Sequence, residues 1–126
     1  MKPEEFKRGE GLRFNENKIP IEFIPLHLLD GAAKVFKNVT ERKEKPYPMW
    51  NWSRGMDWSK PYACLIRHMT AWYRGEDLDK ETKLNHLHHA MCNLLMLTHY
   101  LDAFPEGDDR PKEYFQKGGL NDTFES

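Results

Sequence analysis

Histidine and carboxylate side chains gather around one short polar segment of this sequence. Glu76 and Asp79 lie within the segment, His68 precedes it, and His86 and His89 follow it. At about 100° per residue, His86 and His89 share one side of a predicted helix, next to its apolar face. Neutral imidazoles and carboxylates at a half-buried seam are ligands that divalent metal ions use. The pattern therefore predicts a metal site formed by these side chains.

Each of these residues also has an ordinary structural explanation. A single histidine at the edge of an apolar helical face is more often a hydrogen-bonded structural residue than a metal ligand. Asp79 would also suit a role limited to capping the helix that follows it. What favours a functional site is the grouping of three histidines and two acids, His68, Glu76, Asp79, His86 and His89, along one seam.

Residues 38–58 form a linker with no helical period and with three tryptophans, Trp50, Trp52 and Trp58. One interpretation is that these indoles plug the open end of a helical bundle. The other is that one of them stacks on a planar ligand such as a nucleotide base, as aromatic side chains do in nucleic-acid-binding proteins. The two interpretations are compatible, and the sequence leaves both open.

Isolated polar residues near the apolar segments complete the list of candidate contacts. Lys18, Lys34 and Arg67 flank these segments, and each would be either a solvated cation or a phosphate contact. Asn93 lies in the same helical stripe as the two later histidines. The sequence has no phosphate-binding glycine loop and no nucleophile elbow. The two cysteines have no obvious base beside them, so thiol catalysis is not expected.

Three segments have the apolar spacing of helices, at 25–37, from Ser59 as N-cap to a stop at Gly75, and from a start within 79–85 to an end before Pro105. No segment alternates like a strand, so the predicted fold is all-α, a short bundle around a central antiparallel helix hairpin. The faces expected to be buried are Leu28, Leu29, Ala32, Val35 and Phe36 in the first helix, Tyr62, Leu65, Ile66, Met69, Trp72 and Tyr73 in the second, and Leu87, Ala90, Met91, Leu94, Leu95, Leu97 and Leu101 in the third.

The length of 126 residues predicts a single domain. Its helical core is expected at about 20–104, between polar arms at 1–19 and 105–126. Three helices make a small core, and an apolar hairpin of this kind commonly pairs with its twin into a four-helix bundle. We therefore expect a homo-oligomer, a dimer or a tetramer.

The charge balance excludes several classes of protein. Nineteen basic and twenty acidic residues give a net charge of −1, which argues against a nucleic-acid polymer as partner. No apolar run reaches the roughly 18 residues that span a membrane, and the charged N-terminus does not read as a signal peptide. Two distant cysteines cannot form a disulfide framework. We expect a cytoplasmic protein with no membrane partner.

An ordered series of short motifs extends through most of the chain, from residue 13 to residue 101. The motifs are Arg13-Phe14-Asn15 with Lys18, Ile24-Pro25, Gly31-Ala32-Ala33-Lys34, Asn51-Trp52 with Gly55, Arg67-His68 with Trp72, Gly75-Glu76 with Asp79, and His86-Leu87 with His89 and Asn93. This series resembles phage and prophage proteins of the dATP/dGTP diphosphohydrolase N-terminal-domain family.

The resemblance implies a metal-dependent enzyme that hydrolyses a purine deoxynucleoside triphosphate to the monophosphate and pyrophosphate in the host cytoplasm. It also looks distantly like the all-α MazG-type pyrophosphohydrolases, which hold magnesium between acidic pairs on two helices. Here the sequence departs from that pattern, because His86 and His89 stand where acids would be expected. Imidazoles suit manganese, cobalt, nickel or zinc better than magnesium.

Three functions remain open at this point, and the enzymatic one is expected first. In it Glu76 or Asp79 would orient or deprotonate the attacking water. The cations Lys18, Lys34 and Arg67 would offset phosphate charge, and Asn51 with Trp52 would hold the base. The second function is a nucleotide-binding protein that sequesters its ligand without turnover, and the third is a helical structural adaptor.

Overall fold

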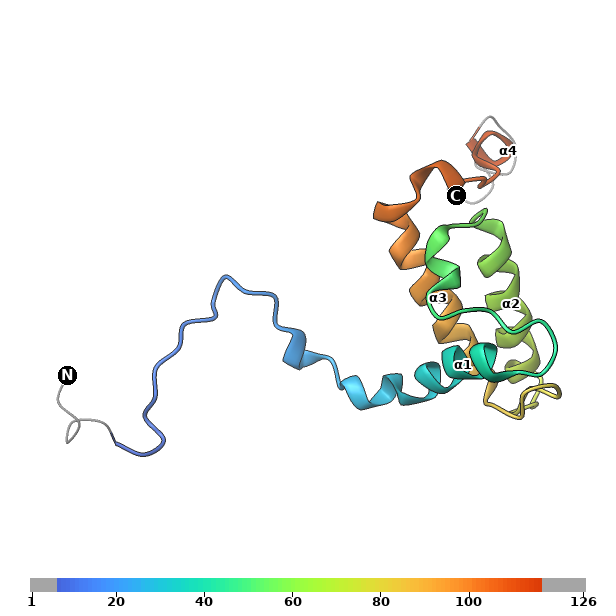
Figure 1. Ribbon diagram of the computed structural model, residues 1–126. Helices are drawn as coiled ribbons and strands as arrows, with labels where there is room; N and C mark the ends of the chain where they lie inside the picture. The colour runs from blue at the N-terminus through green and yellow to red at the C-terminus, as the bar shows by residue number, and fades with distance from the viewer. Residues whose placement is uncertain (1–6, 117–126) are drawn as a thin grey trace.

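The computed structural model describes residues 7–116 and is built of helices (Figure 1). No strand occurs among these residues, and the single isolated bridge pairs Leu78 with Asn85. The predicted all-α class is thus confirmed. The 3-10 helices are η2 (Ile21–Phe23), η3 (Leu26–Leu29), η4 (Asn51–Arg54) and η5 (Pro105–Gly107), and the α-helices are α1 (Asp30–Glu41), α2 (Ser59–Tyr73), α3 (His86–Ala103) and α4 (Lys112–Gln116).

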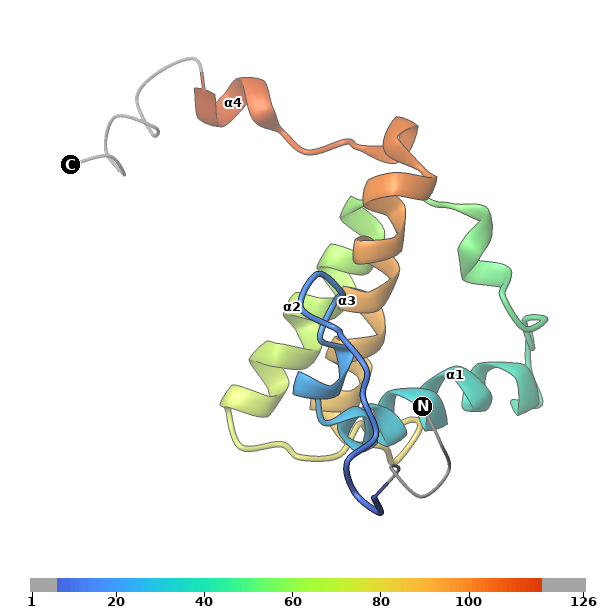
Figure 2. The ribbon, with the colours of Figure 1, turned by 90° about the vertical axis from the view of Figure 1, so that its left-hand side faces the viewer.

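Helices α2 and α3 form an antiparallel hairpin, and α1 crosses α3 near the turn that joins them (Figures 1 and 2). The contact between α1 and α3 is a small apolar cluster of Ala32, Val35 and Cys92. Gly31 permits this approach, because a Cβ atom at that position would overlap the ring of His88. The glycine in the middle of the first predicted helix therefore serves close helix packing.

The start of α2 corrects one prediction. Ser59 is the first residue of the helix and not its N-cap, which is Trp58 with no side-chain cap of its own. A carboxylate from far along the chain takes the capping role: Asp109 accepts hydrogen bonds from the Ser59 N–H at 2.9 Å and from its hydroxyl at 2.5 Å. The predicted end is confirmed, since Gly75 has φ +100°, where a side chain would be strained.

Helix α3 begins at His86 with Asn85 as N-cap, whose side chain accepts a hydrogen bond from the Leu87 N–H at 2.8 Å. It ends at Ala103, before Pro105 as predicted. Asp79 does not cap this helix, so that explanation of Asp79 is wrong. Its carboxylate instead closes the turn that precedes the helix.

The predicted buried faces are correct only in part. Leu94 and Leu101 are 55% and 60% exposed, and Tyr62 and Tyr73 are 58% and 86% exposed. The physical reason is that α3 contacts α2 on one side and α1 on another, while Leu94 and Leu101 line an open groove whose opposite wall is formed by residues 109–116. The buried residues of α3 are His86, Ala90, Cys92 and Tyr100.

The tryptophan-rich linker packs against the far end of the hairpin. Trp58 is buried, and its indole N–H donates to the Phe104 carbonyl at 3.0 Å. Trp52 is half-buried against Phe36 and His99, with ring centroids 5.5 and 5.3 Å away. The interpretation of a packing role is confirmed for both of these indoles.

The N-terminal segment 7–20 extends away from the helices in Figure 1 and is exposed throughout. At the other end of the chain, the residues after α3 fold back onto the start of α2, where the Trp58 N–H donates to the Gly107 carbonyl at 3.0 Å. No helix in the described part of the chain is long and apolar enough to cross a membrane. The division into core and arms stays a prediction.

Candidate metal centre

The turn between α2 and α3 is held in one shape by its own backbone. The Asp79 N–H donates to the Leu84 carbonyl, and the Lys83 N–H donates back to the Asp79 carbonyl, both at 2.8 Å. The His86 N–H donates to the Asp77 carbonyl at 2.9 Å, which fixes the first residue of α3 against the turn. These bonds bring one side chain each from α2, the turn and α3 to the same place.

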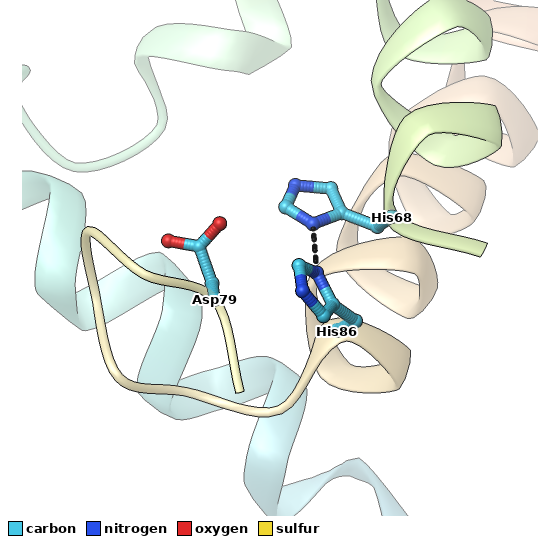
Figure 3. A group of neighbouring side chains, drawn as sticks. All are labelled: His68, Asp79 and His86. Atoms are coloured by element: carbon cyan, nitrogen blue, oxygen red, sulfur yellow. Dashed lines mark hydrogen bonds between the residues drawn. The ribbon is translucent and has the colours of Figure 1, made fainter. Parts of the chain in front are cut away.

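Those three side chains are His68, Asp79 and His86 (Figure 3). The Nδ1 atoms of His68 and His86 are 2.8 Å apart. The carboxylate of Asp79 points toward them from the turn, and one ligand atom from each of the three residues lies within 4.8 Å of the others. The five predicted metal ligands are therefore brought together with these three at the centre.

Glu76 is not a member of this central group, but it contacts the group through His86. Its Oε2 atom is 2.7 Å from the Nε2 of His86, whose side chain is buried. A carboxylate only accepts, so Nε2 of His86 carries the proton of this bond. In the neutral ring the Nδ1 atom then holds a lone pair directed at His68. Glu76 thus sets the tautomer and orientation of His86, as an outer carboxylate does for a metal-bound histidine.

His89 also lies outside the central group. Its ring stacks on His68 with centroids 4.4 Å apart and an interplanar angle of 8°. Its Nε2 atom is 2.7 Å from the Thr82 hydroxyl, which holds the ring in place. Of the five predicted ligands, two thus contact the central residues from outside: His89 holds the ring of His68, and Glu76 holds the ring of His86.

The turn keeps Asp79 ionised. Its Oδ2 atom accepts hydrogen bonds from the Glu81 N–H at 3.0 Å and the Thr82 N–H at 2.8 Å. Partial burial opposes ionisation, but the hydrogen bonds from Thr82 outweigh it and lower the pKa of Asp79 below its usual value. The carboxylate is therefore negative at neutral pH.

The two stacked histidines stay neutral for a different reason. Burial is the largest cause that lowers the pKa of His68, followed by the charge of the neighbouring His89. Burial likewise lowers the pKa of His89. Neutral imidazoles have free lone pairs, which is the form that binds metal ions.

The geometry fits a metal ion. The Nδ1 atoms of His68 and His86 face each other, and the carboxylate of Asp79 lies beside them. The separation of 2.8 Å between the two Nδ1 atoms is that of a hydrogen bond, in which the Nδ1–H of His68 donates to Nδ1 of His86, and an ion bound between the two rings would take the place of this proton. Two imidazoles and one carboxylate leave coordination positions open, as in catalytic zinc sites. The residues present therefore fit a divalent ion that also binds a substrate or water.

The predicted nucleotide contacts are scattered. Lys34 and Arg67 are exposed, and the Arg67 Nη2 is 2.9 Å from the Cys64 sulfur. Asn93 donates its side-chain N–H to the His89 carbonyl in its own helix at 2.9 Å. Lys18 lies in the extended N-terminal segment, where it is exposed. Among these residues Arg67 precedes His68 on α2, and its charge is one of the causes that lower the pKa of His68.

Asn51 and Trp52 lie at the other end of the hairpin. Trp52 contacts His99, ten residues after His89, which corresponds to about 15 Å along α3 at 1.5 Å per residue. A base stacked on Trp52 would be correspondingly far from the histidines. The structure therefore does not join the two parts of the predicted nucleotide pocket.

Sequence reasoning missed Thr82. This residue connects the two sides of the site, since its N–H binds the Asp79 carboxylate and its hydroxyl binds His89. The spacing Asp79-x-x-Thr82 is that of an aspartate that accepts from the backbone three residues on, which is the available sequence signal.

The chain matches known proteins over most of its length. The family model for the N-terminal domain of dATP/dGTP diphosphohydrolases matches residues 8–110. A relative named dATP/dGTP diphosphohydrolase, from Salmonella phage PMBT28, is 29% identical over 100 residues, which are 79% of this chain and 33% of the relative. The chain thus spans about a third of the length of this curated relative. No solved structure matches. From the extent of the family match, the chain belongs to the dATP/dGTP diphosphohydrolase N-terminal-domain family.

Proposed function

We propose that the chain binds a purine deoxynucleoside triphosphate through a divalent metal ion and hydrolyses it to the monophosphate and pyrophosphate. The substrate class comes from the family and from the name of the phage relative. The observation that carries the proposal is the convergence of His68, Asp79 and His86 on one point.

Manganese, cobalt, nickel and zinc suit this ligand set, and magnesium suits it less well, because two of the three inner ligands are nitrogen. When bound, such an ion would neutralise phosphate charge and lower the pKa of a coordinated water. His68, Asp79 and His86 would hold it. Glu76 would keep the Nδ1 lone pair of His86 pointing toward it.

The chain's own residues supply the remaining chemistry. Asp79 is the ionised carboxylate nearest the centre, so it is our choice for orienting the attacking water. After burial and the imidazoles, the charge of Arg67 also lowers the pKa of His68, so Arg67 acts on the centre electrostatically. Its exposed guanidinium would bind phosphate oxygens.

One observation favours a second function, which is nucleotide binding without turnover. Glu76 is committed to His86 and lies 3.9 Å from Lys80, so the central group has one carboxylate, Asp79, for both metal binding and catalysis. A site of this composition would hold a nucleotide–metal complex and release it unchanged. In that case the function of the chain is to sequester a nucleotide.

Product analysis separates these functions. Purified chain would be incubated with dATP or dGTP and each of the five metals in turn, and the products resolved by chromatography. Monophosphate and pyrophosphate, formed by the wild type and not by His86→Ala, support hydrolysis. Metal-dependent nucleotide binding by calorimetry without products supports sequestration. Absence of both metal binding and nucleotide binding contradicts the proposal.

A further inference from the structure

The two imidazoles at the centre are each held by a residue outside it. Glu76 holds the ring of His86 through a hydrogen bond of 2.7 Å. The ring of His68 instead stacks on the ring of His89, with centroids 4.4 Å apart and an interplanar angle of 8°. The orientation of His68 therefore depends on what holds His89.

The hydroxyl of Thr82 holds the ring of His89. The Oγ1 atom of Thr82 and the Nε2 atom of His89 are 2.7 Å apart, and within the described residues this is the one hydrogen bond of the His89 ring. The Oγ1 atom is itself fixed, because it accepts a hydrogen bond from the Leu84 N–H at 3.2 Å. The turn thus fixes the hydroxyl, and the hydroxyl fixes the ring of His89.

An ion at the centre would make this support more important. The Nδ1–H of His68 donates to Nδ1 of His86, and an ion bound between the two rings would replace that hydrogen bond. The stack on His89 would then be the contact with the chain that keeps the ring of His68 facing the ion. Such ligands must be held within about 10–20° of the productive geometry, so a loosened stack should weaken metal binding.

Thr82 also acts on Asp79, through its backbone. The Thr82 N–H donates to the Oδ2 atom of Asp79 at 2.8 Å, and the Glu81 N–H donates to the same oxygen at 3.0 Å. In the part of the chain that the structure describes, the Oδ1 atom accepts no hydrogen bond, which leaves it for the ion. Thr82 therefore contacts one central ligand, Asp79, directly and reaches another, His68, through His89.

From these contacts we infer that Thr82 is a positioning residue of the metal centre, which orients the ligand His68 through His89. This inference rests on the proposed function, because it requires an ion at the centre. It predicts that the hydroxyl at position 82, and not the shape of the side chain alone, sets the metal affinity.

Calorimetric titration of the full chain with manganese or nickel tests this inference. Thr82→Val has nearly the same shape and keeps the N–H that binds Asp79, but it has no group that can bond to His89. Its metal affinity should fall by about 10–100-fold. Thr82→Ser keeps the hydroxyl and should bind metal like the wild type. The matched control is Thr98→Val, which removes an exposed hydroxyl that donates to the Leu94 carbonyl of α3 at 2.8 Å, and its affinity should be unchanged.

Nuclear magnetic resonance of the metal-free chain provides a second measurement. A stacked ring shifts the resonances of its neighbour, so the ring-proton resonances of His68 should move in Thr82→Val and stay in place in Thr82→Ser and Thr98→Val. A role limited to stability would lower the melting temperature of Thr82→Val but leave both these resonances and the metal affinity unchanged.

His89→Phe tests the same contact from its other side, because it keeps a ring to stack on His68 but has no nitrogen for Thr82. It should also weaken metal binding. Since Thr82 acts through His89, combining Thr82→Val with His89→Phe should cost less than the product of the two separate losses. If Thr82→Val loses its helical circular dichroism spectrum, His89→Phe alone provides the test.

The outcomes separate this inference from the proposed function. If the wild type binds metal and Thr82→Val binds it equally well, the inference is wrong and the proposed function stands. If the wild type binds no divalent metal, both are wrong. The inference is also wrong if Thr82→Ser or Thr98→Val binds metal as weakly as Thr82→Val, or if the losses in the double variant multiply.

Discussion

The two halves of α3 are held in place by different interactions. In the first half, His86 and His89 are fixed by hydrogen bonds to Glu76 and Thr82 in the preceding turn. In the second half, Tyr100 is fully buried among aromatic rings, and its hydroxyl donates to the Trp52 carbonyl at 2.5 Å. A ligand can replace hydrogen bonds between side chains, but it cannot replace a packed aromatic ring.

This difference divides the roles along one helix. Changes in the first half should alter metal and nucleotide binding more than stability, and changes in the second half should do the reverse. In the part of the chain that the structure describes, no buried side-chain nitrogen or oxygen lacks a hydrogen-bond partner. The side chains of the histidine seam are therefore held in place before an ion binds, and the hydrogen bond between the Nδ1 atoms of His68 and His86 is the one that an ion would replace.

The largest expected effect is that of His86→Ala. This change removes one of three central ligands and leaves the Glu76 carboxylate without its imidazole, so metal affinity should fall by at least about a hundredfold. Loss of the two hydrogen bonds should also lower the free energy of unfolding by about 1–3 kcal/mol. Calorimetric titration with manganese or nickel measures the affinity, and thermal melting measures the stability.

The control for this variant is His27→Ala, which removes an exposed histidine from η3, outside the centre. It should bind metal like the wild type. Unchanged affinity in His86→Ala would mean that the ion binds elsewhere and would contradict the division of roles along α3. Equal loss in both variants would mean that the loss is not specific to the centre.

Glu76→Gln should have a smaller effect. The amide can still contact His86, but it does not fix the proton on Nε2 as a carboxylate does. Changes to such outer residues typically cost about 10–100-fold in metal affinity. The matched control is Glu81→Gln, an exposed glutamate in the same turn, with unchanged affinity expected. An equal affinity of Glu76→Gln and wild type would exclude the positioning role.

Sequence reasoning located the seam because histidines at i and i+3 and a glycine-terminated helix are local patterns. It predicted three of the α-helices, although α1 is Asp30–Glu41 and not 25–37, and α3 begins at His86 and not within 79–85. It placed His68, Asp79 and His86 around one short turn. It could not rank the five residues, because the ranking depends on which ring nitrogen faces which atom. That detail follows from contacts such as His86 to Glu76, ten residues apart in sequence.

Local sequence patterns do not predict the contacts of the tryptophan-rich linker, residues 38–58. The sequence offered Trp52 as a base-stacking residue or as a packing residue, and nothing local separates them. The contact that establishes the packing role is with His99, 47 positions later in the chain. The cap of α2 failed for the same reason, since its acceptor is Asp109, 50 residues away from Ser59.

Trp50 and Trp52 lie in the same linker but differ in burial, so the effects of replacing each by alanine on stability can be compared. Trp52→Ala should lower the free energy of unfolding by about 2 kcal/mol, roughly half the cost of a fully buried indole, since this side chain is half-buried. Trp50→Ala should change it by less than about 0.5 kcal/mol, because that indole is 63% exposed. Neither change should alter metal affinity. If Trp52→Ala is as stable as the wild type but binds nucleotide more weakly, Trp52 is part of the nucleotide-binding site.

The smallest expected effect is a dependence of stability on pH that arises from the stacked pair of His68 on α2 and His89 in the first half of α3. Burial holds the pKa of His68 and His89 below the ordinary histidine value of 6.5, so between that value and the lowered pKa the unfolded chain binds more protons than the folded one. Stability should therefore be independent of these groups above pH 6.5 and should fall as the pH drops below it. The low pKa of Asp79 acts in the same direction, but only below the ordinary aspartate value of 3.8. Melting temperatures measured without metal across this range give the slope, and the double change His68→Gln with His89→Gln should flatten it. A melting temperature that rises on acidification would mean that the folded state binds the extra protons, and the two rings would then be charged and unable to act as ligands.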